Sequence, residues 1–126
     1  MTLFKSLLAI TLLASANLAS ALEIRPYTAT VLADLQEAGK PVALHFHADW
    51  CPTCRAQEKV FNGWKGDQAV PGTLLVVNYD NERDLKKKMG VRSQSTLIVF
   101  KGKAETARLA GDTDPQALAK ALGSAR

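Results

Sequence analysis

The sequence has few cysteines and lacks a long block of like charges, and both features limit the classes of function that are possible. Its 126 residues include two cysteines, and the lysines and arginines behind its formal charge of +4 are scattered. One cluster, Lys86-Lys87-Lys88, has no aromatic or glycine-rich segment beside it, so we interpret it as a solvated helix face and expect no nucleic-acid partner. With 47% hydrophobic residues and no low-complexity run, the chain is long enough for one globular domain and too short for two.

The first 21 residues have the features of a secretory signal peptide. Lys5 supplies a short positive region, residues 7–18 are mostly apolar, and Ala19-Ser20-Ala21 matches the small-x-small cleavage pattern. The apolar stretch is short for a membrane span, and no stop-transfer segment follows it. We therefore expect cleavage after Ala21, export to the periplasm and a single domain over residues 22–126. An uncleaved N-terminal anchor is the alternative.

The two cysteines, Cys51 and Cys54, are separated by two residues. A structural disulfide stabilises a protein by closing a long loop of the unfolded chain, and a bridge from i to i+3 closes almost none. The pair is therefore poorly placed for stability and well placed for reversible chemistry. A C-x-x-C pair at the junction of a strand and a helix is typical of a thioredoxin-like redox motif.

Hydrophobic periodicity and turn residues predict an α/β domain with a mixed central sheet covered by helices on both faces. In the strand over residues 41–47, positions 42, 44 and 46 are expected on one face and positions 43, 45 and 47 on the other. Strands are predicted over residues 22–27, 41–47, 73–79, 96–100 and 104–109, and helices over residues 28–38, 54–65, 80–89 and 115–122.

The run GKPVALHFHADWCPTCRAQEKVF, residues 39–61, resembles the thioredoxin superfamily. Within it, the run is most similar to the C-terminal periplasmic domain of the membrane disulfide reductant transporter DsbD. Farther on, residues 90–97 (GVRSQSTL) and 100–102 (FKG) align with the loop and hairpin that face the active site in that family, and Gly111 matches the glycine before the last helix. The resemblance covers essentially the whole chain after residue 21 and implies a thioredoxin fold.

Two positions depart from the pattern of that family. Its members usually carry a cis-proline in the downstream loop, where this chain has Ser95, and a buried acid in the strand before the motif, where this chain has His45. A cis peptide bond before a non-proline residue costs about 2.5–4 kcal/mol. Either Gln94–Ser95 is cis despite that cost, or the bond is trans and the loop differs; in both cases we expect Ser95 to face Cys51. An acid of the reductant-transporter domain is retained as Glu58.

The resemblance implies that Cys51 attacks a substrate disulfide and Cys54 resolves the mixed disulfide. Unpaired N–H groups and the dipole at the start of the helix would stabilise a Cys51 thiolate. Cys54 needs a base, for which His45 and Glu58 are candidates; a packed core histidine and an exposed helix carboxylate are the alternatives.

The substrate groove is expected to involve residues around the motif and in the downstream loop. Trp50 is expected to pack under the motif, and His47 to lie at the surface or to flank the site. The hydroxyl of Thr53 faces either a sulfur or solvent. The predicted groove residues are Trp50, Pro52, Thr53, Gln94 and Ser95.

The predicted function is that of an exported thiol–disulfide oxidoreductase that reduces periplasmic protein disulfides through the dithiol. We expect a monomer without a bound cofactor or metal, with a membrane reductant transporter as its electron donor. A thiol oxidase or isomerase shares the fold and the motif. A metal-binding module, in which the cysteines and His45 or His47 hold Cu(I) or Zn(II), is the alternative from a different class. Metal analysis of protein purified reduced and without oxygen, beside an insulin-reduction assay, separates these classes.

Overall fold

The computed structural model describes residues 21–126, so the predicted signal peptide lies outside the described residues except for Ala21. The described chain alternates between strands and helices in the order that the hydrophobic pattern predicts. The strands are β1 (Glu23–Pro26), β2 (Pro41–His47), β3 (Thr73–Asn78), β4 (Thr96–Lys101) and β5 (Ala104–Ala110), and the helices are α1 (Ala29–Glu37), α2 (Pro52–Gly63), α3 (Arg83–Met89) and α4 (Pro115–Gly123).

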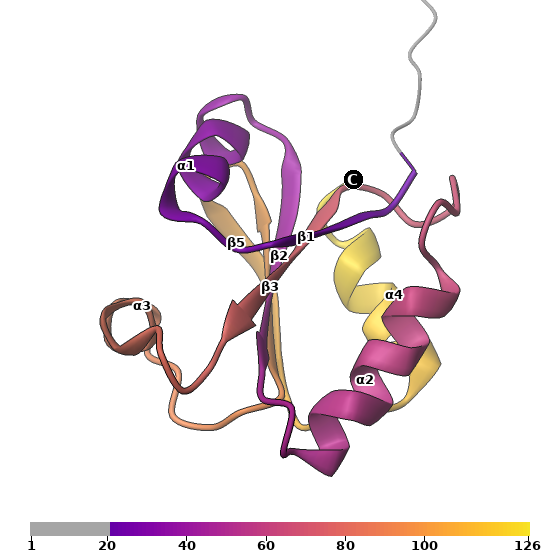
Figure 1. Ribbon diagram of the computed structural model, residues 1–126. Coiled ribbons are helices and arrows are strands. Elements are labelled where there is room, and N and C mark those ends of the chain that lie inside the picture. The colour runs from indigo at the N-terminus through magenta and orange to yellow at the C-terminus, as the bar shows by residue number, and fades with distance from the viewer. Residues whose placement is uncertain (1–20) are drawn as a thin grey trace, which may run out of the picture.

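The five strands form one mixed sheet in the order β1-β3-β2-β4-β5. β1 and β2 both pair with β3 in parallel, whereas β4 pairs antiparallel with β2 and with β5. Parallel neighbours need a crossover between them, and α2 provides it for β2 and β3. α1 and α3 cover one face of the sheet, and α2 and α4 cover the other (Figure 1). The predicted mixed sheet with helices on both faces is confirmed.

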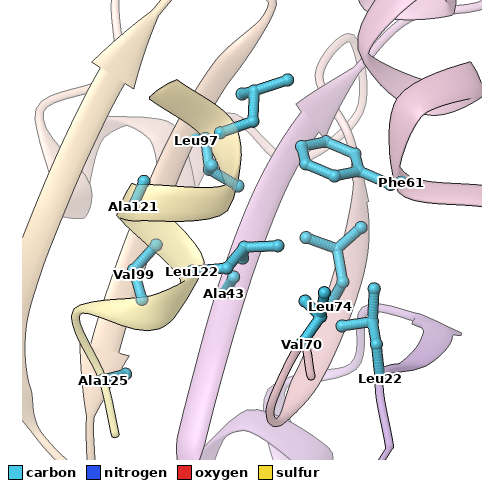
Figure 2. Packing of buried hydrophobic residues seen from close by; sticks show 11 residues of the cluster. Leu22, Ala43, Phe61, Val70, Leu74, Leu97, Val99, Ala121, Leu122 and Ala125 are labelled. Atoms are coloured by element: carbon cyan, nitrogen blue, oxygen red, sulfur yellow. The ribbon is translucent and has the colours of Figure 1, made fainter. Parts of the chain in front are cut away.

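Each face of the sheet has its own buried hydrophobic cluster. Under α1 and α3, the side chains of Val42, Leu44 and Phe46 pack from β2, as the alternation of that strand predicts. Under α2 and α4, the cluster of Figure 2 joins Phe61 of α2 to α4 and the opposite face of the strands. Ala43 belongs to this second cluster, which confirms the predicted phase of β2.

Helix α4 begins with a favoured capping residue, whereas α2 begins with an unusual one. In α4, Asp114 caps the helix by accepting a hydrogen bond from the N–H of Gln116, and Pro115 occupies the first turn. α2 begins at Pro52, two residues earlier than predicted, with Cys51 as its N-cap. The prediction was late because proline is favoured in the first turn, where its missing N–H costs nothing.

The ends of two neighbouring strands bring the cysteine pair and the downstream loop together. β2 ends just before Cys51, and the antiparallel β4 begins opposite that end, with Phe46 paired to Thr96. The N–H of Ser95 donates to the carbonyl of Phe46 at 2.8 Å. The sheet register therefore fixes residue 95 beside the start of α2. None of the helices in residues 21–126 has the length and hydropathy to cross a membrane.

Candidate active site at the start of α2

Cys51 and Cys54 lie at the N-terminus of α2, and neither forms a disulfide in the described structure. The sulfur of Cys51 caps the helix, because it accepts a hydrogen bond from the N–H of Cys54 at 3.2 Å. Helix N-terminal N–H groups lack partners within the helix and carry a partial positive charge, so they favour an anion at this position. The backbone thus holds the Cys51 sulfur where a thiolate is stabilised.

Both thiols are buried in this conformation. Cys51 is 2% exposed and Cys54 is fully covered, and they pack against Ala48 and the half-buried ring of Tyr79. A thiol one turn inside the helix is expected to be shielded, as Cys54 is, whereas an attacking thiol at the start of the helix is expected to be accessible, and Cys51 is not in this conformation. The difference arises because a side chain that caps its own helix folds back over the first turn instead of pointing outward.

Ser95 faces the cysteine pair, as predicted, and its hydroxyl contacts both sulfurs. Ser95 Oγ lies 3.3 Å from Cys51 Sγ and 2.9 Å from Cys54 Sγ. All peptide bonds of residues 21–126 are trans, so the loop reaches the cysteines without a cis bond. Ser95 instead has a φ of 65°, a left-handed conformation that is uncommon outside glycine.

The surroundings of the two thiols move their pKa values in opposite directions. Burial raises the pKa of Cys51, but hydrogen bonds from Cys54, from Ser95 and from the backbone N–H groups of Cys54 and Thr53 outweigh it, so the net pKa is lowered. Burial and the neighbouring Cys51 raise the pKa of Cys54, with Ser95 acting against them. The first cysteine is the one that ionises more readily.

His45 points to the α2 side of the sheet, as the strand phase predicts, but its partner is a residue that the sequence did not single out. His45 Nε2 lies 2.9 Å from Gln57 Oε1. The amide nitrogen of Gln57 donates to the carbonyls of Ser95, at 3.0 Å, and of Asp112, at 2.8 Å. Because Gln57 Oε1 can only accept, His45 Nε2 carries the proton and donates it. Burial lowers the pKa of His45 to about 4, so the ring is neutral near pH 7.

Gln57 could have been found from the helical period. Cys54, Gln57 and Phe61 are the buried residues of α2 and recur at intervals of three and four, which places a polar amide on the buried stripe of the helix. A fully buried glutamine must have partners for its oxygen and its nitrogen. Here those partners tie together a strand, the loop before β4 and the segment before α4.

Glu58, the other predicted proton acceptor, lies against His47 instead of against Cys54. Glu58 Oε2 is 2.6 Å from His47 Nε2, although the two groups lack the alignment of a hydrogen bond, and Asp49 lies 3.6 Å from the other ring nitrogen. His47 is 8% exposed, so the surface position is wrong, and the ring lies buried beside the site. It is covered because α2 crosses over the end of β2 and brings the Glu58 side chain onto the ring.

Trp50 is 59% exposed, the most prominent departure among the predicted groove residues. It does not pack under the motif, because its indole N–H donates to Asp80 Oδ2 at 2.8 Å. Trp50 and Asp80 line a hollow of about 350 Å³ that also borders Asn78. An aromatic ring with a fixed orientation and an exposed face suits contact with a polypeptide. Pro52 is exposed, whereas Thr53 and Gln94 are half-buried.

The histidines do not join the cysteines in a metal-ligand set. In residues 21–126, no three or more His, Cys, Asp and Glu side chains are grouped to hold a metal ion. His45 Nε2 is engaged with Gln57, and His47 faces Glu58 and Asp49. Metal binding by the dithiol is therefore not the function that this geometry favours.

The fold places a C-x-x-C dithiol after a strand and at the start of the following helix. One thiol has a lowered pKa and the other a raised pKa. These features together define a thiol–disulfide oxidoreductase. Comparison with known proteins agrees. The family model described as thioredoxin matches residues 24–124, so the chain belongs to the thioredoxin family.

Individual relatives give the extent of the similarity. The chain is 33% identical to a thioredoxin of Alicyclobacillus acidocaldarius over 60% of this chain and 71% of that protein. It is 35% identical to the thiol:disulfide interchange protein DsbD of Salmonella paratyphi A, over 63% of this chain and 16% of that much longer protein. The crystal structure of Trxlp from Edwardsiella tarda superposes with a TM-score of 0.75 at 32% identity, covering 79% of this chain and 98% of the other.

Proposed function

We propose that this protein is exported to the periplasm and reduces disulfides of periplasmic proteins through Cys51 and Cys54. The observation that carries the dithiol chemistry is the position of Cys51 Sγ at the start of α2, 3.2 Å from the N–H of Cys54, together with the asymmetry of the two thiols: the pKa of Cys51 is lowered and that of Cys54 is raised. A thiolate is the attacking species in disulfide exchange, so the asymmetry favours Cys51 as the nucleophile. Cys54 remains a protonated thiol until it resolves the mixed disulfide.

The reaction proceeds in two exchanges. The Cys51 thiolate attacks one sulfur of the substrate disulfide, forming a mixed disulfide and releasing the other substrate sulfur, which takes up a proton. Cys54 then loses its proton, and its sulfur attacks Cys51 Sγ. The Cys51–Cys54 bond forms as the mixed disulfide breaks, and the second substrate sulfur leaves and is protonated. Two electrons pass from the protein to the substrate, and the protein ends as the disulfide.

Trp50 and the loop before β4 flank the dithiol and form the docking surface of this proposal. The exposed face of Trp50 offers apolar contact, and Pro52, Thr53 and Gln94 are the neighbouring positions that a substrate segment meets. The contact of Ser95 with both sulfurs places its loop directly against the reacting atoms. A substrate polypeptide that docks here has to expose Cys51, which is 2% exposed in the described conformation.

The reducing direction and the electron donor are supported by the similarity to DsbD. The segment from residue 39 to 61 resembles the C-terminal domain of that transporter, and the aligned DsbD of Salmonella is 35% identical over 88 residues. We therefore propose a membrane reductant transporter as the donor that returns the Cys51–Cys54 disulfide to the dithiol. The chain works as a monomer in this scheme, since each dithiol completes the exchange on its own.

The reduction potential of the Cys51–Cys54 couple tests the direction. For a reductase we expect a value near that of thioredoxin, about −270 mV, measured by equilibration with a dithiol redox buffer. A value near that of a strong oxidant, about −120 mV, would assign the protein to thiol oxidation instead. Intermediate values near those of isomerases, about −180 mV, would also contradict the proposed direction.

Export is tested by the N-terminus of the protein made from the full-length sequence in a bacterial host. We expect the periplasmic fraction to contain a product that begins at Leu22, identified by intact mass. A matched Ala19→Leu/Ala21→Leu variant removes the small residues of the cleavage pattern and should accumulate uncleaved. Full-length protein in the cytoplasmic fraction, unchanged by this variant, would disprove the export proposal.

A further inference from the structure

The hydroxyl of Ser95 is within hydrogen-bond distance of both reacting sulfurs, at 3.3 Å from Cys51 Sγ and 2.9 Å from Cys54 Sγ. A serine hydroxyl has one proton to donate and two lone pairs that accept. It can therefore donate to one sulfur at a time, and it can change partner by rotating about its C–O bond. Ser95 is 2% exposed, so water does not compete freely for this position.

The backbone of Ser95 is fixed by three hydrogen bonds. Its N–H donates to Phe46, and its carbonyl accepts from the side chain of Gln57, at 3.0 Å, and from the N–H of Gly111, also at 3.0 Å. A serine at a φ of 65° persists where its surroundings determine the conformation. Gln57 is in turn oriented by His45, so the amide is a positioning residue for the hydroxyl rather than a group that touches the sulfurs.

The other candidates for assisting Cys54 are engaged elsewhere. His45 donates its Nε2 proton to Gln57, and Glu58 lies against His47. Cys54 Sγ lies 3.9 Å from the carbonyl of Phe46 and 2.9 Å from Ser95 Oγ. Hydrogen bonds from Ser95 and from the backbone of Ala48 both lower the pKa of Cys54, and of these two donors only the serine hydroxyl also reaches Cys51 Sγ.

We propose that the Ser95 hydroxyl stabilises the two sulfurs in turn, donating to Cys51 Sγ when that sulfur is the nucleophile and to Cys54 Sγ when that sulfur resolves the mixed disulfide. The inference rests on the proposed dithiol function and assigns a further catalytic residue to it. The serine keeps its own proton throughout; the proton that Cys54 loses passes to the departing substrate sulfur. Hydrogen bonding to Ser95 lowers the pKa of each thiol, which is the direction that the proposal requires.

The first test is the pH profile of Cys51 alkylation by iodoacetamide in the reduced Ser95→Ala variant. Removal of a hydrogen bond to a charged sulfur is expected to move the profile to higher pH and to slow alkylation at neutral pH by about tenfold. The plateau rate at high pH should stay close to that of the wild type, because every thiol is then ionised. An unchanged profile would overturn the proposal for Cys51.

The second test isolates the resolving step. Cys51 is loaded as a mixed disulfide with a small chromophoric thiol, and release of that thiol by Cys54 is followed in a single turnover. We expect release from Ser95→Ala to be about tenfold slower than from the wild type at neutral pH. Equal release rates would overturn the part of the proposal that concerns Cys54.

Two further variants separate this role from a general effect on the loop. Ser93→Ala removes an exposed hydroxyl from the same loop and should leave both readouts unchanged. Gln57→Met keeps the volume of the side chain but removes its hydrogen bond to the Ser95 carbonyl. It should shift the alkylation profile in the same direction as Ser95→Ala. The double variant Gln57→Met/Ser95→Ala should be no slower than Ser95→Ala, because both substitutions act on the same hydrogen bond from the Ser95 hydroxyl to the sulfurs. Additive losses would contradict a positioning role for Gln57.

Failure of this inference and failure of the proposed function give different results. Alkylation involves no substrate and no electron donor, so its pH profile reports on Ser95 whichever redox direction the protein has. A wild-type protein with an oxidising potential and a Ser95-dependent profile would overturn the proposed direction alone. A reducing potential with profiles that do not depend on Ser95 would overturn the role of the serine alone.

Discussion

Cys54→Ser is expected to abolish catalysed insulin reduction and to accumulate mixed disulfides on Cys51. The variant retains the thiolate that attacks but lacks the sulfur that releases the product, so the reaction stops at the covalent intermediate. Turnover should fall to the uncatalysed rate, a loss of at least about a thousandfold. The measurement is insulin reduction, combined with non-reducing electrophoresis of the variant after exposure to periplasmic proteins.

The matched control is Cys51→Ser. Because this variant has lost the nucleophile and keeps the thiol with the raised pKa, it should be as inactive as Cys54→Ser while trapping almost no partner. If trapped species instead accumulated on Cys54 in the Cys51→Ser protein, the attacking and resolving roles would be reversed.

The free energy of unfolding is expected to fall by about 3 kcal/mol as the pH is lowered from 7 to 4, owing to His45 alone. Burial lowers the pKa of His45 in the folded protein from 6.5 to about 4, with the charge of His47 acting in the same direction and the Gln57 hydrogen bond opposing it. Between these two values the unfolded chain binds a proton that the folded chain does not. Stability is therefore complete above pH 6.5 and is lost progressively below it. Denaturant unfolding at a series of pH values measures the slope.

His45→Gln distinguishes this contribution from that of the carboxylates. The substituted side chain can still donate to Gln57 but does not titrate, so its stability should depend less steeply on pH than that of the wild type. His47→Gln, in which His45 is retained, should keep most of the slope. Parallel curves for the wild type and His45→Gln would show that the folded protein tolerates a charged imidazole at this position.

Much of the fold follows from periodicity, because the relevant signals are local. The alternation of residues 41–47 predicts which side chains of β2 face α1 and α3, and the two clusters confirm it. Glycine and proline mark the ends of most elements within one to three residues. The start of α2 was predicted two residues late, since a cysteine is seldom an N-cap and only the three-dimensional structure shows its sulfur in that role.

The site was predictable where it depends on chain order and less so where it depends on side-chain partners. The motif places both cysteines at the helix start, and the family alignment places Ser95 opposite them. The pairing of His45 with Gln57, and of Glu58 with His47, depends on which residues of α2 overlie β2. That register comes from tertiary packing, so the sequence identified the polar residues without identifying their partners.

The two departures from the family pattern are connected in the structure. His45, where an acid is usual, and Ser95, where a proline is usual, are both hydrogen-bonded to the side chain of Gln57. A buried carboxylate in place of His45 could not donate to Gln57 Oε1 when ionised, and it would have to find its hydrogen bonds elsewhere. Gln57, His45 and Ser95 therefore form one hydrogen-bonded group next to the cysteine pair, and this group contains both departures from the family pattern.

The burial of Cys51 limits which oxidants reach its sulfur. A thiol with a lowered pKa is prone to stepwise oxidation by peroxides when solvent reaches it, and sulfinic acid cannot be returned to thiol by disulfide exchange. Cys51 is 2% exposed, so only a small part of this residue meets dissolved peroxide in the described conformation. The backbone hydrogen bond that caps α2 at Cys51 Sγ thus lowers the pKa of this sulfur in the same conformation that limits its contact with solvent.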